Sequence, residues 1–220
     1  MPLGSRKGKR ADRNISFGTR NPELEHYIIV TDTKETENNY FKGLKEQIPE
    51  KLRGRVVITT RKAETKNLID AAVEERNKNP QYRKIWIVFD RDEVTNFDDI
   101  IFQAIKRDIN VAWSNPCIEI WFFAYFRSMP AIALSNKCCE KFGELYYKKS
   151  GGEKYDKADP YIFKKLRKLG SLEEAIKRAE NRDRQFRLNS CDNVKPSEYC
   201  PCTTMYVLVE EIWNRIKGNK

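Results

Sequence analysis

Four short apolar runs in the first half of the chain have the composition of buried β-strands. Each is rich in Ile, Val, Phe or Trp and is bounded by polar residues. They cover residues 27–30, 56–58, 85–89 and 109–113. The segments between them place apolar residues at the three- and four-residue spacing of helices that bury one face. We therefore expect strands and helices to alternate, which predicts an α/β fold with a mostly parallel sheet flanked by helices.

Polar residues mark where the first helices should begin. Thr36 is expected to cap a helix over residues 37–48, and a second helix is expected over residues 65–77. Asn96 precedes a third helix, whose first turn carries Asp98 and a neighbouring aspartate. Acidic side chains in a first turn interact favourably with the helix dipole, so this position explains both aspartates without a catalytic role.

The second half of the chain is predicted to be mainly helical. An aromatic helix is expected over residues 117–126, a basic helix after a capping box that starts at Ser171, and a last helix from Thr203 or Thr204. Residues 188–202 contain two prolines and three cysteines and are expected to form an irregular connection.

The pattern divides the chain into three regions. Residues 1–24 are polar and basic and are expected to form a flexible arm. Residues 25–130 carry the strand–helix alternation and form the predicted α/β core. Residues 131–220 are expected to be a helical C-terminal region packed on that core.

The composition suits a protein with its own core and a large solvated surface. The chain has 220 residues, of which 40% are hydrophobic and 34% are charged. No apolar run reaches the roughly 18–20 residues that span a bilayer, and no apolar signal segment is seen, so we expect a cytoplasmic protein. The single histidine, His26, excludes H-E-x-x-H metalloproteases and any mechanism that needs two histidines. Its place just before a strand favours a structural role.

The six cysteines lack the C-x₂-C spacing of zinc modules. They are Cys117, Cys138, Cys139, Cys191, Cys200 and Cys202. Reduced, partly buried thiols are the usual state in a cytosolic protein, and the spacing favours this interpretation. The alternative is a soft-metal site in which the cysteines near residue 200 join Cys138 and Cys139.

The positive charge is concentrated in two parts of the chain. The net charge is +10, and residues 1–20 and residues 160–190 each carry an excess of five positive charges, while the remaining residues balance. Such basic regions favour binding to a polyanion, and the alternative is a solvated helix face with a basic tail. The candidate nucleic-acid-binding residues are Lys164, Lys165, Arg167, Lys168, Arg182, Arg184 and Arg187.

Carboxylates follow two of the predicted strands at the point where each strand ends. Asp90 and Asp92 close the third strand, and Asp32 closes the first. Side chains two residues apart on a strand share a face, and ligands bind beyond the carboxyl ends of parallel strands, so the three acids should meet if these strands are neighbours. Glu37, in the next helix, is close enough to join them. Such a cluster repels itself unless Mg²⁺ or Mn²⁺ lies among its oxygens. The alternative is that Asp90 and Asp92 are solvated loop charges.

Glu119 is the only charged residue in the aromatic run of residues 117–126. An unpaired carboxylate buried there would cost several kcal/mol, so it must reach the sheet edge, a basic side chain or solvent. Two roles remain open: a role in the site, as a metal ligand or as an organiser of the ligands, and a structural ion pair.

Several of these segments resemble motifs of the RloB/AbiLii-like proteins. The first predicted strand with Thr36–Phe41 is similar to their opening motif, Ile87–Glu93 to their D-x-D segment, Ala112–Trp121 to their most distinctive stretch, and Pro196–Ser197 with Thr203–Leu208 to their closing region. The likeness runs from about residue 25 to residue 215. These are prokaryotic anti-phage defence proteins with a Toprim-like fold, commonly paired with an ATPase.

The resemblance implies a Toprim-like nuclease that depends on a divalent metal ion. Asp90 and Asp92 would be metal ligands, Glu37 and Glu119 would be acids of the family motif, and Asp32 would complete the metal site or accept a proton from the attacking water. An effector of abortive infection would cut RNA, including tRNA, or DNA, together with a partner ATPase. The sequence leaves homo-oligomerisation open.

The sequence departs from the family pattern directly after the first strand. Asp32-Thr33 stands where the family and Toprim enzymes generally have Glu-Gly. Aspartate reaches one methylene less, and Thr33 restricts the backbone where glycine would not. One alternative is therefore a non-catalytic module that binds nucleic acid or nucleotide and regulates an ATPase. Another is a Toprim-type nucleotidyl or phosphoryl transferase, which the lack of a Walker-type Gly-rich loop disfavours.

Overall fold

The structure is a computed structural model that describes residues 24–33, 35–60, 67–92, 94–189 and 194–217. The predicted basic arm of residues 1–24 lies outside the described residues except for Leu24. Among the described helices, each is too short or too polar to pass through a lipid bilayer.

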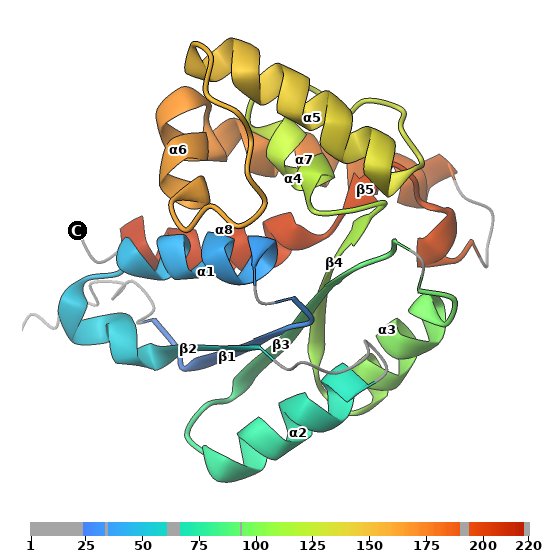
Figure 1. The fold of residues 1–220 in the computed structure, drawn as a ribbon. Coiled ribbons are helices and arrows are strands. Elements are labelled where there is room, and N and C mark those ends of the chain that lie inside the picture. Colours follow the sequence, from blue (N-terminus) through green and yellow to red (C-terminus); the bar gives the residue numbers. More distant parts are fainter. Residues whose placement is uncertain (1–23, 34, 61–66, 93, 190–193, 218–220) are drawn as a thin grey trace, which may run out of the picture.

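A five-stranded sheet forms the centre of the described chain (Figure 1). Its strands are β1 (Tyr27–Thr31), β2 (Val56–Thr60), β3 (Lys84–Asp90), β4 (Asn110–Asn115) and β5 (Cys202–Thr203). They are ordered β2-β1-β3-β4-β5; the first four are parallel, and β5 is antiparallel to β4. The prediction of an α/β fold with a mostly parallel sheet and a helical C-terminal part is confirmed.

The helices account for most of the remaining described chain. They are α1 (Thr36–Glu46), α2 (Leu68–Lys78), α3 (Phe97–Lys106), α4 (Glu119–Ala124), α5 (Ser135–Ser150), α6 (Ile162–Leu169), α7 (Leu172–Asn189) and α8 (Met205–Lys217). Two short 3₁₀ segments, η1 (Glu50–Arg55) and η3 (Pro196–Glu198), precede β2 and β5.

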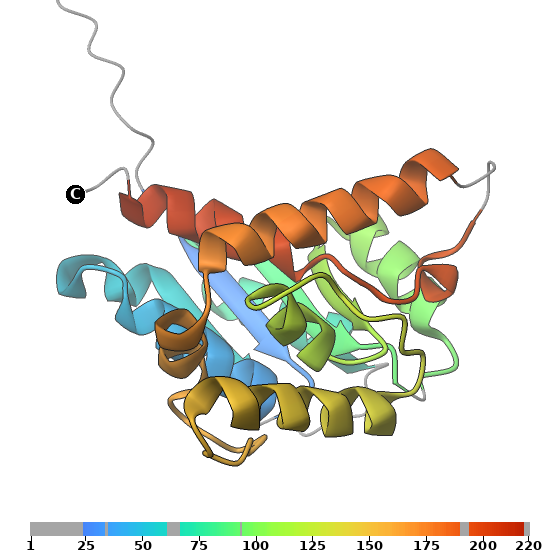
Figure 2. The same cartoon turned by 90° about the horizontal axis from the view of Figure 1, so that it is seen from above.

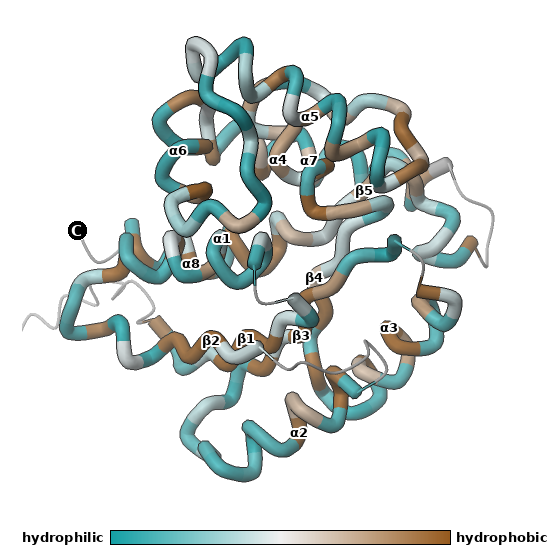
Figure 3. The backbone as a smooth tube through the Cα atoms, in the orientation of Figure 1, coloured by the Kyte–Doolittle hydropathy of each residue, from teal (hydrophilic) through white to brown (hydrophobic). Residues whose placement is uncertain are grey.

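Alternate residues of the strands face two different helical layers. Ile28 and Val30 of β1 are buried in one core with residues of α2 and α3. Tyr27 and Ile29 are buried in the other core, to which α1 and α4–α8 contribute. Figure 1 shows α2 and α3 below the sheet and the other helices above it, and Figure 2 shows α4 between α5 and α7. In Figure 3 the hydrophobic residues concentrate in the strands and on the helix faces that cover them.

The strand order reverses between β1 and β3. The chain moves from β1 to β2 through α1 on one face, and it then reaches β3 and β4 through α2 and α3, which lie on the other face. The loops that leave β1 and β3 therefore diverge to opposite faces and open a crevice at the carboxyl ends of these two strands.

Three predicted details of the helices and strands differ from the structure. Thr36 does not cap α1; it is the first residue of the helix, and its Oγ1 donates to the Lys157 carbonyl at 3.1 Å. The aromatic helix is six residues long rather than ten, because the Ala124 and Tyr125 carbonyls accept from Arg178 and Ser171 instead of continuing the helix. β5 joins the last residue predicted to be irregular, Cys202, to Thr203, a predicted helix start, since two residues that pair with the end of β4 leave no local pattern.

One of the two hydrogen bonds of the predicted capping box at Ser171 is present. The Glu174 amide donates to the Ser171 hydroxyl at 3.2 Å at the start of α7. The first two residues of the helix expected at 65–77 lie outside the described part of the chain.

Candidate metal centre

The carboxyl ends of β1 and β3 meet at the crevice where the strand order reverses. The two strands are parallel neighbours, with Thr31 opposite Val88. Asp32 directly follows β1, its amide donates to the Val88 carbonyl at 3.3 Å, and Asp90 is the last residue of β3. The condition on which the predicted convergence of acids depended, that the first and third strands are neighbours, is therefore met.

A cavity of about 580 Å³ lies beyond these strand ends. All five predicted acids line it: Asp32, Glu37, Asp90, Asp92 and Glu119. Glu37 reaches it from the first turn of α1 and is only 2% exposed. The alternative that both aspartates are solvated loop charges does not fit Asp90, which is partly buried and accepts from a backbone amide, whereas Asp92 is exposed in the turn after β3.

Asp90 and Asp92 are held by the backbone around them. The amide of Ile118 donates to Asp90 Oδ2 at 2.9 Å, and the amide of Asp92 donates to the Pro116 carbonyl at 2.9 Å. Asp92 lies beyond the strand and has a φ of 28°, a conformation that aspartate tolerates better than most residues. The two side chains thus share the cavity because the chain turns after β3, and not because both lie on one strand face.

Three carboxyl groups in this cavity, those of Asp32, Glu37 and Asp90, are harder to ionise than ordinary acids. Burial, and then the charge of Glu37, raises the pKa of Asp32 from 3.8 to about 8. Burial, followed by the charges of Glu37 and Asp32, also raises the pKa of Asp90, and burial raises the pKa of Glu37. Burying several ionised carboxylates next to one another costs free energy unless a positive charge lies among them.

Two buried carboxylate oxygens in the cavity lack a hydrogen-bond partner among the described residues. They are Asp32 Oδ1 and Glu119 Oε2. Buried hard oxygen atoms that lack hydrogen-bond donors suit a hard divalent cation such as Mg²⁺ or Mn²⁺. The residues therefore fit the predicted metal ion.

Thr33 partly satisfies the buried acid of α1. Its Oγ1 donates to Glu37 Oε2, and this hydrogen bond opposes the rise in the pKa of Glu37. The residue that stands in place of the family glycine thus adds a hydroxyl donor to the cluster. Glycine could not provide this contact.

Glu119 fits both roles that the sequence left open. It is 1% exposed, accepts from the Tyr155 hydroxyl at 3.0 Å and lies 3.7 Å from Lys157 Nζ, while its other oxygen is buried without a hydrogen-bond partner among the described residues. Sequence reasoning missed Tyr155 and Lys157 because they lie in the irregular segment between α5 and α6, where no periodic pattern places them.

Two thiols lie next to Glu119. One ligand atom each from Cys117, Glu119 and Cys139 lies within 4.8 Å of the others. Hydrogen bonding to Cys138 raises the pKa of Cys117, and hydrogen bonding to Cys117 followed by burial raises the pKa of Cys139. The described cysteines are free thiols, as expected.

The soft-metal grouping considered from the sequence is not formed by the described cysteines. Cys200 Sγ instead donates to the Ile132 carbonyl at 3.7 Å, and Cys202 is buried in β5. Cys191 lies outside the described residues. Cys117 had no part in the grouping considered from the sequence, yet its thiol lies close to that of Cys139.

The predicted nucleic-acid-binding residues lie on α6 and α7, and many have structural contacts. Lys165 pairs with Glu153 and Asp159, Arg167 stacks over Trp213 at 4.5 Å, Arg182 donates to the Pro201 carbonyl, Arg184 donates to Asn181, and Arg187 pairs with Asp183. Lys164 and Lys168 are exposed. Because α4 lies between α5 and α7 (Figure 2), the arginines of α7 do not border the acidic cavity.

Two side chains to which the sequence assigned no catalytic role, His26 and Asp98, have structural contacts. The His26 ring packs edge-on against Tyr82 with centroids 5.3 Å apart. Asp98 accepts from the amide of Ser197 at 2.8 Å and from its hydroxyl at 2.5 Å, which ties the start of α3 to the segment before β5.

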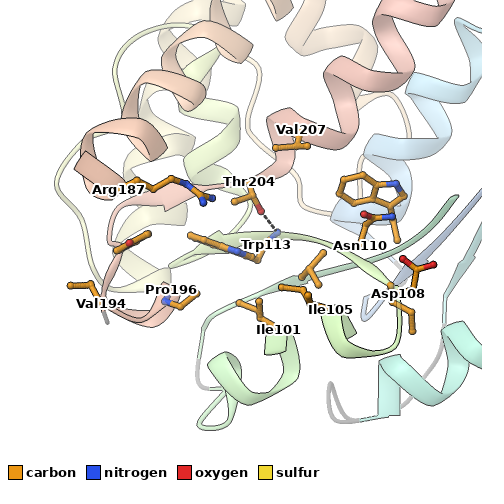
Figure 4. Close-up of a pocket in the computed structure, with 14 residues that line it drawn as sticks. Ile101, Ile105, Asp108, Asn110, Trp113, Arg187, Val194, Pro196, Thr204 and Val207 are labelled. Carbon is orange, nitrogen blue, oxygen red and sulfur yellow. Dashed lines mark hydrogen bonds between the residues drawn. The ribbon is translucent and has the colours of Figure 1, made fainter. Parts of the chain in front are cut away.

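A second cavity, of about 530 Å³, lies at the other edge of the sheet (Figure 4). It is bordered by α3, β4 and α8, and the Trp113 amide donates across its wall to Thr204 Oγ1 at 3.0 Å. Its lining is mainly apolar and contains one acid, Asp108. Because carboxylates do not gather there, the chemistry predicted from the sequence belongs to the first cavity.

Comparison with known proteins assigns the chain to a family. Neither the curated proteins nor the solved structures gave a match. The sequence model described as "RloB-like protein" matches residues 27–212, a span that contains the five acids and all five strands. The chain is therefore a member of the RloB-like protein family.

Proposed function

We propose that the protein is a nuclease that depends on Mg²⁺ or Mn²⁺ and acts as the effector of a prokaryotic anti-phage defence system. The observation that carries the proposal is the convergence of Asp32, Glu37, Asp90 and Asp92 on one cavity at the reversal point of the sheet. Grouped carboxylates with raised pKa values are the usual setting for a divalent cation in phosphate chemistry.

Each acid has a part suggested by its surroundings. Asp90 is oriented by the Ile118 amide and, with Asp92, would hold the metal ion. Asp32, whose pKa of about 8 lies near neutral pH, is placed to accept the proton of the attacking water. Bound Mg²⁺ or Mn²⁺ would supply positive charge at the phosphate that is cut.

The substrate is proposed to be RNA, including tRNA, or DNA. Lys164 and Lys168 of α6 are exposed, and Lys157 lies at the cavity itself. These lysines and the basic residues 1–20 would hold a phosphate backbone through charge, which predicts binding that weakens steeply with salt. A partner ATPase of the same defence system would control the activity.

A non-catalytic module that regulates an ATPase is the second candidate. It is favoured by the hydrogen bond from Thr33 to Glu37, which occupies a carboxylate oxygen that a metal ion would otherwise use. This candidate predicts that the basic residues matter for function while the acids do not.

Cleavage of labelled RNA and DNA by the purified full chain distinguishes the two candidates. Reactions contain Mg²⁺, Mn²⁺ or EDTA, with and without a partner ATPase, and compare the wild type with Asp90→Ala, Asp92→Ala and the matched control Asp99→Ala. Asp99 is an exposed acid of α3 outside the cavity. We expect metal-dependent cleavage that both cavity variants abolish and the control retains. Tight binding without cleavage under every condition would favour the regulatory module.

A further inference from the structure

We propose that Cys117, Glu119 and Cys139 form a second cation site in the same cavity, selective for Zn²⁺ or a similar thiolate-binding metal ion. Their ligand atoms come from three places in the sequence: the turn after β4, the first residue of α4 and the second turn of α5. Two thiolates and one carboxylate form a softer ligand set than the aspartates beside them, and such a set binds Zn²⁺ rather than Mg²⁺.

The distances suit closure around a single ion. Zn–S bonds of about 2.3 Å and Zn–O bonds of about 2.1 Å in tetrahedral geometry separate the ligand atoms by about 3.5–3.8 Å. The three atoms here lie within 4.8 Å of one another. Side-chain rotations that move each atom by less than about 1 Å would therefore complete the site, and no backbone rearrangement is needed.

Glu119 Oε2 independently indicates a ligand at this position. This oxygen is buried and lacks a hydrogen-bond partner, in a side chain that is 1% exposed. Tyr155 and Lys157 both contact the other oxygen, Oε1. A carboxylate that is held on one side and unpaired on the other leaves a lone pair available for a cation.

The cavity provides the entry path and leaves room for a fourth ligand. Cys117, Glu119 and Lys157 all line it, so an ion that enters reaches Cys117 and Glu119 without crossing the core, and Cys139 lies next to them. Three protein ligands with one open position suit a zinc ion that also binds water. The ammonium of Lys157 competes with the ion for Glu119, and its side chain is 55% exposed and can swing into solvent.

Cobalt substitution tests the site without any assay of nuclease activity. The full chain, stripped of metal and kept reduced under nitrogen, is titrated with Co²⁺ and then with Zn²⁺. We expect the near-ultraviolet absorption of a thiolate–cobalt bond, which Zn²⁺ removes because it binds such sites more tightly. Cys117→Ser and Cys139→Ser should each weaken binding at least about tenfold, as should Glu119→Gln. Cys200→Ser, which alters a thiol outside the site, should not.

Two further variants separate this proposal from the nuclease proposal and from misfolding. Lys157→Gln removes the competing ammonium and should tighten Co²⁺ binding several-fold while the circular dichroism stays native. Asp90→Ala should keep the thiolate–cobalt absorption even if it abolishes cleavage. The proposal is overturned if Co²⁺ gives no thiolate absorption, if the absorption survives both serine variants, or if Glu119→Gln and Lys157→Gln leave the affinity unchanged.

Discussion

Replacing Asp32 by asparagine should make the metal-free protein more stable at neutral pH. The pKa of Asp32 rises from 3.8 to about 8 on folding, because the side chain is buried beside Glu37. In the unfolded chain this carboxyl loses its proton near its ordinary pKa, so above that pH folding must take a proton up. Stability that is present at acid pH is therefore lost as the pH rises through the window from about 4 to about 8. Asparagine resembles the protonated acid and removes this dependence.

The size of the effect follows from the same two pKa values. Within the window, one group contributes about 1.4 kcal/mol per pH unit, so the wild type should lose up to about 3 kcal/mol relative to Asp32→Asn between about pH 5 and about pH 7. Glu37 and Asp90 titrate together with Asp32 and share part of this loss. We expect a measured difference of about 1–3 kcal/mol.

Urea unfolding in EDTA across this pH range measures the difference directly. The free energies of unfolding of the wild type and Asp32→Asn should be closest near about pH 4 and separate steadily towards about pH 8, with the variant more stable. Excess Mg²⁺ should restore much of the lost stability to the wild type at neutral pH and less to the variant. Asp99→Asn serves as the exposed control and should show no such divergence. A difference between wild type and Asp32→Asn that stays constant with pH would refute the reasoning.

Two further predictions test the packing and the departure from the family pattern. Gly43→Ala should destabilise the fold by about 1–3 kcal/mol, because an added Cβ would lie 2.5 Å from Phe163 Cβ. The control Gly54→Ala adds a Cβ that meets no atom within 4 Å, so its stability in thermal unfolding should be nearly that of the wild type. Thr33→Gly removes the hydroxyl donor of Glu37 and should destabilise the metal-free protein by about 1–3 kcal/mol at neutral pH, while the stabilisation by Mg²⁺ increases. If Mg²⁺ raises the free energy of unfolding of the wild type and of Thr33→Gly by the same amount, this hydrogen bond does not compete with the metal ion.

The sheet and its acids were predictable because their positions follow from local pattern and parallel topology. A buried strand that ends in a carboxylate delivers that carboxylate to the edge where its parallel neighbour also ends, so Asp32 and Asp90 meet once β1 and β3 are adjacent. The position of Asp92 was predicted correctly for an incomplete reason. It depends on the turn after β3 and on the Pro116 carbonyl, contacts that strand periodicity does not encode.

The residues around Glu119 were not predictable, because tertiary packing places them. Cys139 lies on α5, and Tyr155 and Lys157 lie in the segment that follows it. Whether these residues approach Glu119 depends on how α5 packs on α4, and no spacing within either segment specifies that angle. β5 was missed for the same reason, since it is defined by its pairing with β4 and not by its own two residues.

Glu119 lines the cavity with the predicted acids and also contacts Tyr155 and Lys157, which the sequence did not predict. Its burial in an aromatic run required a partner, and the structure provides a hydroxyl and an ammonium at Oε1, two nearby thiols, and a place in the lining of the acidic cavity. A carboxylate shared in this way is oriented by whichever positive charge is nearest. A cation among the aspartates, a cation at the thiols and Lys157 are therefore alternatives for the same side chain. Occupying one position should alter the affinity of the others, since all three lie in one cavity with little water to screen them.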